Sequence, residues 1–311
     1  MTELAWDALV RLLEPAARAT GPEGLVRLAR RTAPGLLRAL PGRRASLRAV
    51  ARDWMGLRLD PTAERELLER ALAEECARQA EILLGRPRAV PVEGFGVLEA
   101  AHRCGRGVVL VTCHAGPHHR AGLALAARGL RVFELGLAPA AVDRVLERPS
   151  GLGRALRRHG ARARRQEPVV HLSVGPGTGH ASLRRALRAL AEGGVVVVPG
   201  DGLWARSTLT VPLLAGRARL PTGPARLARR AGSPLVFGAL APAAEGWVLG
   251  LGPAREPPAS SSEVLDAVRA YGAWLEAQVR AQPALHLWRW ATIHRLQARG
   301  LQDFFQPDAG L

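Results

Sequence analysis

Three histidines lie within six residues of one another, at His114, His118 and His119. They follow a short apolar run, Val108–Thr112, and precede a stretch of helical pattern, Arg120–Arg128. A residue in that position sits at the carboxyl end of a sheet, where α/β folds bind ligands. A neutral imidazole there can remove a proton from a substrate hydroxyl, and amides at the start of the next helix would face a developing oxyanion. We therefore predict that His114 is a general base.

Two other interpretations of the histidines stay open at this point. They can be ordinary loop residues, or His114 and His118, four apart, can bind a metal together with His119. However, no nearby cysteine or carboxylate completes a zinc pattern, and Pro117 would begin a helix between the ligands. We predict a site that uses neither metal nor cofactor.

A single carboxylate follows a second apolar run. Val195–Val198 is followed by Pro199, Gly200 and Asp201. If both apolar runs are parallel strands, Asp201 and His114 lie at the same edge of the sheet. We predict that Asp201 is a supporting acid for His114; the alternative is that it caps a turn.

A third segment combines arginines with a helix start. Thr222 and Gly223 precede a helical pattern that begins at Pro224, and Arg217 lies a few residues upstream. We expect the Thr222 side chain to cap this helix. A helix start with an arginine nearby binds phosphate, so we predict that Arg217, Thr222 and Gly223 contact substrate. The alternative is a plain capped helix with surface arginines.

The fold that must position these residues is predicted to be α/β. From about residue 92, fully apolar runs alternate with helical stretches, which indicates buried strands of a mostly parallel sheet flanked by helices. The predicted strands are Val108–Thr112, Leu130–Leu135, Val169–Leu172, Val195–Val198, Leu235–Leu240 and Trp247–Leu251. The predicted helices are Val97–Cys104, Arg120–Arg128, Val142–His159, Ser182–Ala191, Pro224–Ala231 and Glu263–Ala281.

Two parts are expected. Residues 1–90 form a helical N-terminal extension, with a helix that starts at Asp60 and Pro61, and residues 91–311 form the α/β domain. The extension packs on the core, and one arginine-rich face can also rest on an anionic membrane.

Composition narrows the class of partner. The chain has 311 residues with 48% apolar content, which excludes a disordered protein. Its net charge is +17, and every basic residue other than histidine is arginine. Base composition explains why arginine replaces lysine but not the surplus, which predicts attraction to polyanions. No apolar run approaches the roughly 20 residues that span a bilayer, and three scattered cysteines argue against a disulfide framework.

In order and spacing, these motifs resemble the bacterial lipid A late acyltransferases, the lauroyl- and myristoyltransferases of the lysophospholipid acyltransferase superfamily. The similar region runs from about Gly107 to Arg295. It begins with a strand that ends in a histidine, here His114 with position 119. A Leu-Arg-rich helix (Leu183–Leu190), a Gly-Gly pair (Gly193, Gly194), an apolar strand (Val195–Val198) and an aspartate (Asp201) follow. The remaining motifs are a Val-Pro run that ends in Gly-Arg (Val211–Arg217), a Thr-Gly-Pro-Ala motif (Thr222–Ala228), and a C-terminal Pro, Trp and His-Arg pair (Pro283, Trp288, His294 and Arg295).

The resemblance implies a glycerolipid acyltransferase-like fold and O-acyl transfer from an acyl thioester. In that family a His–carboxylate dyad deprotonates the acceptor hydroxyl, and family arginines that bind phosphate would correspond to Arg157 and Arg217. The chain departs from the family in two places. Position 119, where the family has Glu or Asp, is His119, so Asp201 or Glu134 would have to supply the carboxylate, with His119 orienting the ring. The family's N-terminal membrane helix is also missing.

The prediction is therefore an acyltransferase that acts in lipid A biosynthesis or on a related glycolipid or lysolipid. Its expected partners are acyl carrier protein or acyl-CoA, an anionic glycolipid acceptor and the inner-membrane surface, which it would reach as a peripheral protein on the cytoplasmic face. The alternative is a weak or inactive homologue that binds a lipid or a protein partner. Nucleic acid is not an expected partner, because aromatic residues total only 4% and no nucleic-acid module is present.

Overall fold

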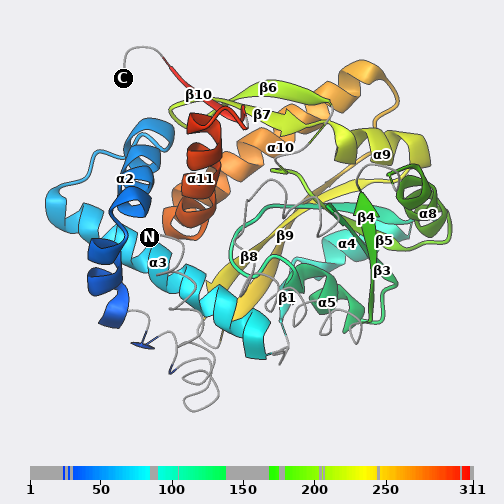
Figure 1. Cartoon of the computed structure of the whole chain (residues 1–311). Helices are drawn as coiled ribbons and strands as arrows, with labels where there is room; N and C mark the ends of the chain where they lie inside the picture. The colour runs from blue at the N-terminus through cyan, green and yellow to red at the C-terminus, as the bar shows by residue number, and fades with distance from the viewer. Residues whose placement is uncertain are drawn as a thin grey trace.

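The computed structural model describes residues 24, 27–28, 31–84, 90–103, 105–137, 168–174, 179–202, 205, 207–243, 246–301 and 303–308. A seven-stranded sheet forms its centre (Figure 1). In spatial order the strands are β1 (Val92–Glu93), β9 (Gly246–Arg255), β8 (Leu235–Ala243), β2 (Val108–Thr112), β5 (Val195–Pro199), β3 (Val132–Leu137) and β4 (Val169–Val174).

The predicted α/β architecture is confirmed. The five strands from β8 to β4 are mutually parallel, and β9 pairs antiparallel with β8. All six predicted strands are present. The residues Val195–Val198 in β5 and Val108–Val111 in β2 are almost completely buried, as expected for strands covered on both faces.

Helices cover both faces of this sheet. Helices α4 (Phe95–His102) and α5 (Arg120–Ala126) lie on one side, and α8 (Gly179–Ala191), α9 (Gly223–Ala231) and α10 (Ser261–Ala281) lie on the other (Figure 1). Five of the predicted helices therefore exist, with bounds shifted by a few residues. The sixth, Val142–His159, lies outside the described residues.

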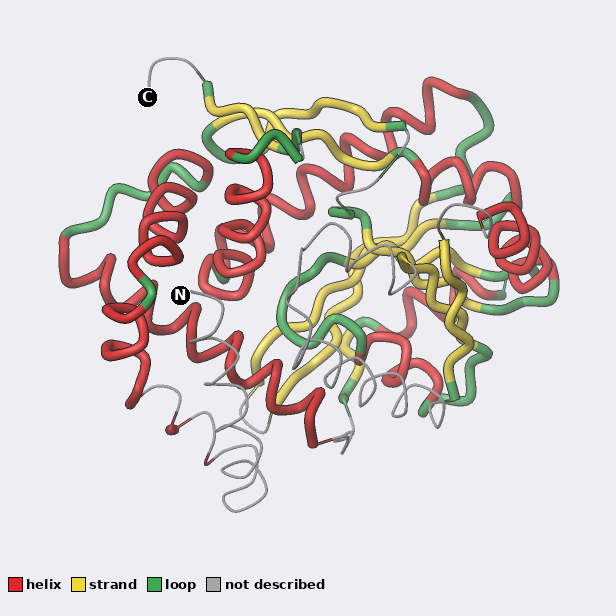
Figure 2. The backbone as a smooth tube through the Cα atoms, viewed as in Figure 1, coloured by secondary structure: helices red, strands yellow, loops and turns green. Residues whose placement is uncertain are grey.

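The described residues between 31 and 84 are mostly helical, and a C-terminal helix packs in the same layer. Helix α2 (Pro41–Ala49) continues into a π-helical turn, η1 (Val50–Trp54), and is followed by the long helix α3 (Pro61–Leu84). Asp60 caps α3, because its Oδ1 accepts hydrogen bonds from the amides of Thr62 and Ala63. Helix α11 (Pro283–Ala298) packs against α2 and α3, so the layer crosses the predicted boundary at residue 90 (Figure 2).

A small antiparallel sheet was not predicted. It consists of β10 (Phe305–Pro307), β7 (Gly216–Pro221) and β6 (Thr208–Leu213). Its strands alternate apolar with polar or charged residues, so they lack the continuous apolar runs that marked the strands of the main sheet. No helix in the described part of the chain is long and apolar enough to cross a membrane.

Candidate active site

Strand register brings His114 and Asp201 together. In the parallel pair β2–β5, Thr112 lies opposite Pro199 at the carboxyl ends of both strands. His114 and Asp201 each lie two residues beyond this last pair. Both residues therefore follow neighbouring strands at the same edge of the sheet, where ligands bind in α/β folds.

Both oxygens of the Asp201 carboxylate are bonded to His114. The backbone N–H of His114 donates to Oδ2 at 2.8 Å, and ring atom Nδ1 lies 2.7 Å from Oδ1. An ionised carboxylate only accepts, so Nδ1 carries the proton and donates it. The other ring nitrogen, Nε2, is then left with a lone pair. This is the tautomer that a general base requires.

The electrostatics of the pair keep Asp201 ionised. Its side chain is 1% exposed, and burial alone would raise the pKa of its carboxyl group. The charge of His114 and the two hydrogen bonds from that residue outweigh burial, and Arg289 adds to their effect, so the pKa lies below its ordinary value. The negative charge of Asp201 is therefore present at neutral pH and can stabilise an imidazolium at His114.

Gly200 and Tyr271 fix the loop that carries Asp201. The Gly200 N–H donates to the carbonyl of Thr112 at 2.7 Å, and the Tyr271 hydroxyl donates to the same oxygen at 2.9 Å. A Cβ atom at position 200 would lie 2.5 Å from Tyr271 Cζ and 2.6 Å from a methyl carbon of Val111. Only glycine lets the chain pass between these side chains, and this constraint holds the carboxylate in line with His114.

The other two histidines form a chain of ring contacts with His114. The rings of His114 and His118 meet edge to face with centroids 4.5 Å apart, and those of His118 and His119 are 6.1 Å apart. Nδ1 of His118 is shielded from solvent and has no hydrogen-bond partner among the described residues. Burial, and then the nearby positive charges of His114, His119 and two arginines, hold the pKa of His118 well below its usual range. His118 is therefore neutral at pH 7 and does not repel a protonated His114.

Asp201 rather than His119 is the partner of the His114 ring at Nδ1, and a role for His119 elsewhere at the ring stays a prediction. The carboxylate of Asp201 already occupies Nδ1, and His118 lies between the other two rings in the chain of ring contacts. Glu134, the second carboxylate considered for the dyad, contacts Nδ1 of His171 at 3.0 Å instead. No group of three or more metal-binding side chains occurs in the described ranges.

Cys113, next to His114 in the chain, is not a plausible nucleophile. Its thiol is buried, and burial together with the charge of Asp201 raises its pKa far above the ordinary value. Since the thiolate is the reactive form, Cys113 is inert at neutral pH.

In the described structure no bond links the residues predicted to bind phosphate to His114 or Asp201. Arg217 is exposed on β7. Thr222 is the N-cap residue of α9, as predicted, but its side chain makes no capping bond. Its hydroxyl donates instead to Ser207 Oγ at 2.9 Å, which corrects the predicted cap. Gly223 is exposed at the start of α9, and Arg157 lies outside the described residues.

Two amides predicted to face an oxyanion are already used. The N–H of Arg120 donates to the carbonyl of Pro117, and that of Ala121 donates to the carbonyl of His118. The prediction remains untested for the other amides between residues 115 and 119.

Helix α11 supplies site residues that sequence reasoning missed. His286 is 2% exposed, and the charge of Asp201 influences its pKa. Arg289, three residues on and thus on the same helix face, lowers the pKa of Asp201. By contrast His294, which the family comparison had singled out, packs edge to face against Trp54 at 5.5 Å. The three-residue spacing of His286 and Arg289 was visible in the sequence, but nothing there tied α11 to the sheet edge.

No protein-family model matches the chain, and no curated protein matches it in sequence. The chemistry of the site itself is therefore the basis for assigning a function.

Proposed function

We propose that the protein transfers a fatty acyl group from a thioester to the hydroxyl of a glycolipid or lysolipid. The observation that carries the proposal is the hydrogen bond between His114 Nδ1 and the buried, ionised carboxylate of Asp201. A histidine held in this way has a basic Nε2 and a counter-charge for its protonated form, which are the two requirements of a general base.

The reaction begins with proton transfer from the acceptor hydroxyl to Nε2 of His114. As the O–H bond breaks, the acceptor oxygen attacks the carbonyl carbon of the thioester and forms a new C–O bond. The negative charge passes to the carbonyl oxygen of a tetrahedral intermediate. The carbonyl then re-forms, the C–S bond breaks, and the leaving sulfur takes the proton from Nε2. The products are an ester and a free thiol, and His114 returns to its starting state.

Asp201 stays ionised throughout this cycle. It holds the Nδ1 proton of His114 and balances the positive charge that the ring carries after the first step. No covalent acyl-enzyme is needed, which agrees with the inert thiol of Cys113.

The charge of the chain suits the substrates that the family resemblance implies. Acyl carrier protein, acyl-CoA, a phosphorylated glycolipid and an anionic membrane surface would all be attracted by a net charge of +17. The finer assignments, namely the acyltransferase-like fold, lipid A as the pathway and a peripheral location at the cytoplasmic face of the inner membrane, belong to this proposal and rest on the resemblance.

A non-catalytic homologue that binds lipid or a protein partner is the competing function. The buried carboxylate favours catalysis over this alternative, because a binding protein has no need to hold His114 in the basic tautomer. Asp201 carries a desolvation cost that its contacts with His114, with a contribution from Arg289, offset.

The decisive experiment compares His114→Ala with His119→Glu. Each variant would be incubated with acyl-labelled acyl carrier protein and extracted membrane lipid, and the labelled ester would be quantified. We expect His114→Ala to abolish transfer and His119→Glu to keep or raise the rate, since Nδ1 of His114 already has its carboxylate. Full activity of His114→Ala would refute the mechanism, and complete loss in His119→Glu would show that His119 has acquired a role of its own.

A further inference from the structure

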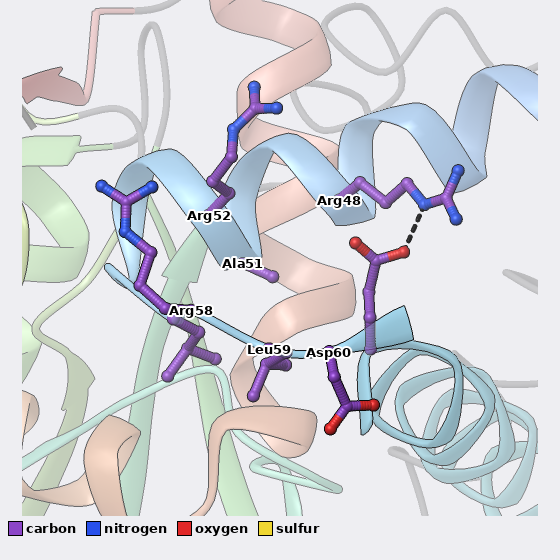
Figure 3. A pocket seen from close by; sticks show the side chains of 8 residues that line it. Arg48, Ala51, Arg52, Arg58, Leu59 and Asp60 are labelled. Carbon is purple, nitrogen blue, oxygen red and sulfur yellow. Dashed lines mark hydrogen bonds and ion pairs between the residues drawn. The ribbon is translucent and has the colours of Figure 1, made fainter. Parts of the chain in front are cut away.

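A second charged site lies in the helical layer, away from the dyad in the chain. Between η1 and the start of α3 there is a pocket of about 460 Å³ (Figure 3). Three arginines contribute to its lining: Arg48 and Arg52 come from α2 and η1, and Arg58 comes from the loop that follows. In Figure 3 the Arg52 and Arg58 side chains extend away from Leu59 and Asp60. The pocket is also lined by Ala51, Leu57, Leu59, Asp60 and Glu64.

The backbone builds this pocket in a defined way. The N–H of Met55 donates to the carbonyl of Val50, five residues back, so the helix ends in a wide π-turn. Gly56 follows with φ of 69°, and a Cβ atom there would lie 3.2 Å from Ala215 Cβ. This left-handed residue reverses the chain, so that residues 57–60 run back beneath the helix (Figure 3).

The three arginines are available to a ligand. Arg48 pairs with Glu64 and Arg52 pairs with Asp53, but the arginine side chains are 47% and 66% exposed. Exposed ion pairs contribute little to stability, although the Arg52–Asp53 pair is bidentate, through Nε to Oδ1 and Nη2 to Oδ2. Within the described part of the chain, Arg58 has no ion-pair partner, and it is exposed. Asp60, which caps α3 through the amides of Thr62 and Ala63, stays ionised two residues away from Arg58, because these bonds lower the pKa of its carboxyl group.

Apolar surface lies next to these charges. Leu59 is 39% exposed, which makes it one of the few large apolar side chains on the surface of the described residues, and Leu57 beside it is half-buried. The lining carries three arginines against two acidic residues, Asp60 and Glu64, and Glu64 pairs with Arg48. Arginines that line a pocket beside an exposed leucine match a phosphate headgroup attached to an acyl chain.

We infer that this pocket binds the phosphate group of an anionic phospholipid and holds the protein on the membrane surface, with Leu59 inserted among the acyl chains. The inference rests on the proposed function only in choosing a membrane as the source of the phosphate. Vesicle binding and acyl transfer are measured separately, so His114→Ala should bind vesicles like the parent protein, and either idea can fail alone.

The test is co-sedimentation of the full chain with vesicles of one part phosphatidylglycerol to three parts phosphatidylcholine. The double variant Arg52→Gln/Arg58→Gln should bind about 20- to 30-fold more weakly, because each arginine at an anionic surface contributes about fivefold. The matched control, Arg184→Gln/Arg185→Gln, removes the same charge from exposed positions on α8, at the opposite end of the molecule (Figure 1). It should bind within about twofold of the parent, because salt screens charges beyond about 10 Å. Equal losses in both double variants, or none in either, would overturn the inference.

A second arm separates lipid from a free phosphate ester. Leu59→Gln should weaken vesicle binding by about tenfold, as expected for a leucine that leaves water on insertion. It should leave the affinity for soluble glycerol phosphate, measured by calorimetry, unchanged. If Leu59→Gln binds vesicles like the parent while glycerol phosphate binds tightly, the pocket takes a soluble phosphate ester and the assignment to a membrane lipid is wrong.

Discussion

Replacing Asp201 with asparagine tests the dyad most sharply, because the carboxylate bridges two donors of one residue. The backbone N–H of His114 donates to one oxygen and ring Nδ1–H to the other. Asparagine has only one acceptor oxygen in its side chain. The backbone N–H is a donor in every state, so the amide oxygen turns toward it. The asparagine NH₂ then faces Nδ1, which must give up its proton, and the proton moves to Nε2. The ring is left in the tautomer that cannot accept a proton from substrate.

The magnitude follows from three losses: the hydrogen bond, the basic tautomer and the counter-charge. The charge-assisted hydrogen bond to the ring contributes about 1.5 to 3 kcal/mol, or roughly 10- to 150-fold in rate. The wrong tautomer and the missing counter-charge add to this. The same substitution in a serine protease triad lowers kcat by about 10⁴-fold. Since Asp201 is 1% exposed and water cannot replace its charge, we expect a loss of about 10³- to 10⁴-fold.

The assay is initial-rate ester formation from acyl carrier protein thioester, combined with ¹⁵N NMR of the His114 ring. Asp201→Asn should lower kcat with little change in KM. The ¹⁵N signals of the ring should show that the proton has moved from Nδ1 to Nε2. Asp266→Asn is the matched control, because this exposed aspartate pairs with Arg269 on α10 and should leave the rate unchanged. A rate within about tenfold of the parent, with the tautomer shifted, would refute the reasoning.

Two further predictions concern stability. Burial lowers the pKa of His286 to about 4, below the value of 6.5 it has when unfolded, so the unfolded chain binds more protons between these pH values. Stability should therefore fall by about 3 kcal/mol as pH drops from about 6.5 to 4, and denaturant unfolding of His286→Gln should lack much of this dependence, unlike exposed His180→Gln. Gly200→Ala should lower the free energy of unfolding by about 1 to 3 kcal/mol, because its Cβ overlaps Tyr271 and Val111, and it should also slow acyl transfer. Tyr271→Phe removes one hydrogen bond without overlap and should cost only about 1 kcal/mol, so an equal or larger cost than in Gly200→Ala would contradict the packing argument.

The main sheet could be predicted because its strands carry a strong local signal. A continuous apolar run such as Val195–Val198 is buried on both faces and reads as a strand without knowledge of its neighbours. The small sheet gave no such signal. Arg217 and Arg219 interrupt β7, which pairs with β6 along its whole length and, over Gly216–Ala218, with β10, about 90 residues later in the chain. Long-range pairing of this kind depends on tertiary contacts rather than on local pattern.

The candidate site was also predictable only in part. The approach of Asp201 to His114 followed from the rule that parallel strands present their carboxyl ends at one edge. Which polar group met the ring did not follow, since the spacing in the chain pointed to His119 and the register pointed to Asp201. His286 and Arg289 could not be placed, because they come from α11, whose position depends on how the helical layer packs rather than on the sheet.

The position of the carboxylate changes how the site should respond to substitution. A dyad partner five residues away, on the same loop as the histidine, would move with that histidine whenever the loop moved. Asp201 instead belongs to the end of β5, and the pair is held by the strand register and by the contacts of Gly200 with Thr112. Changes in the loop at 115–119 should therefore affect substrate contacts while the basic tautomer of His114 persists. Changes at Gly200 or Tyr271 should affect the tautomer itself, although neither residue contacts the imidazole through any described bond.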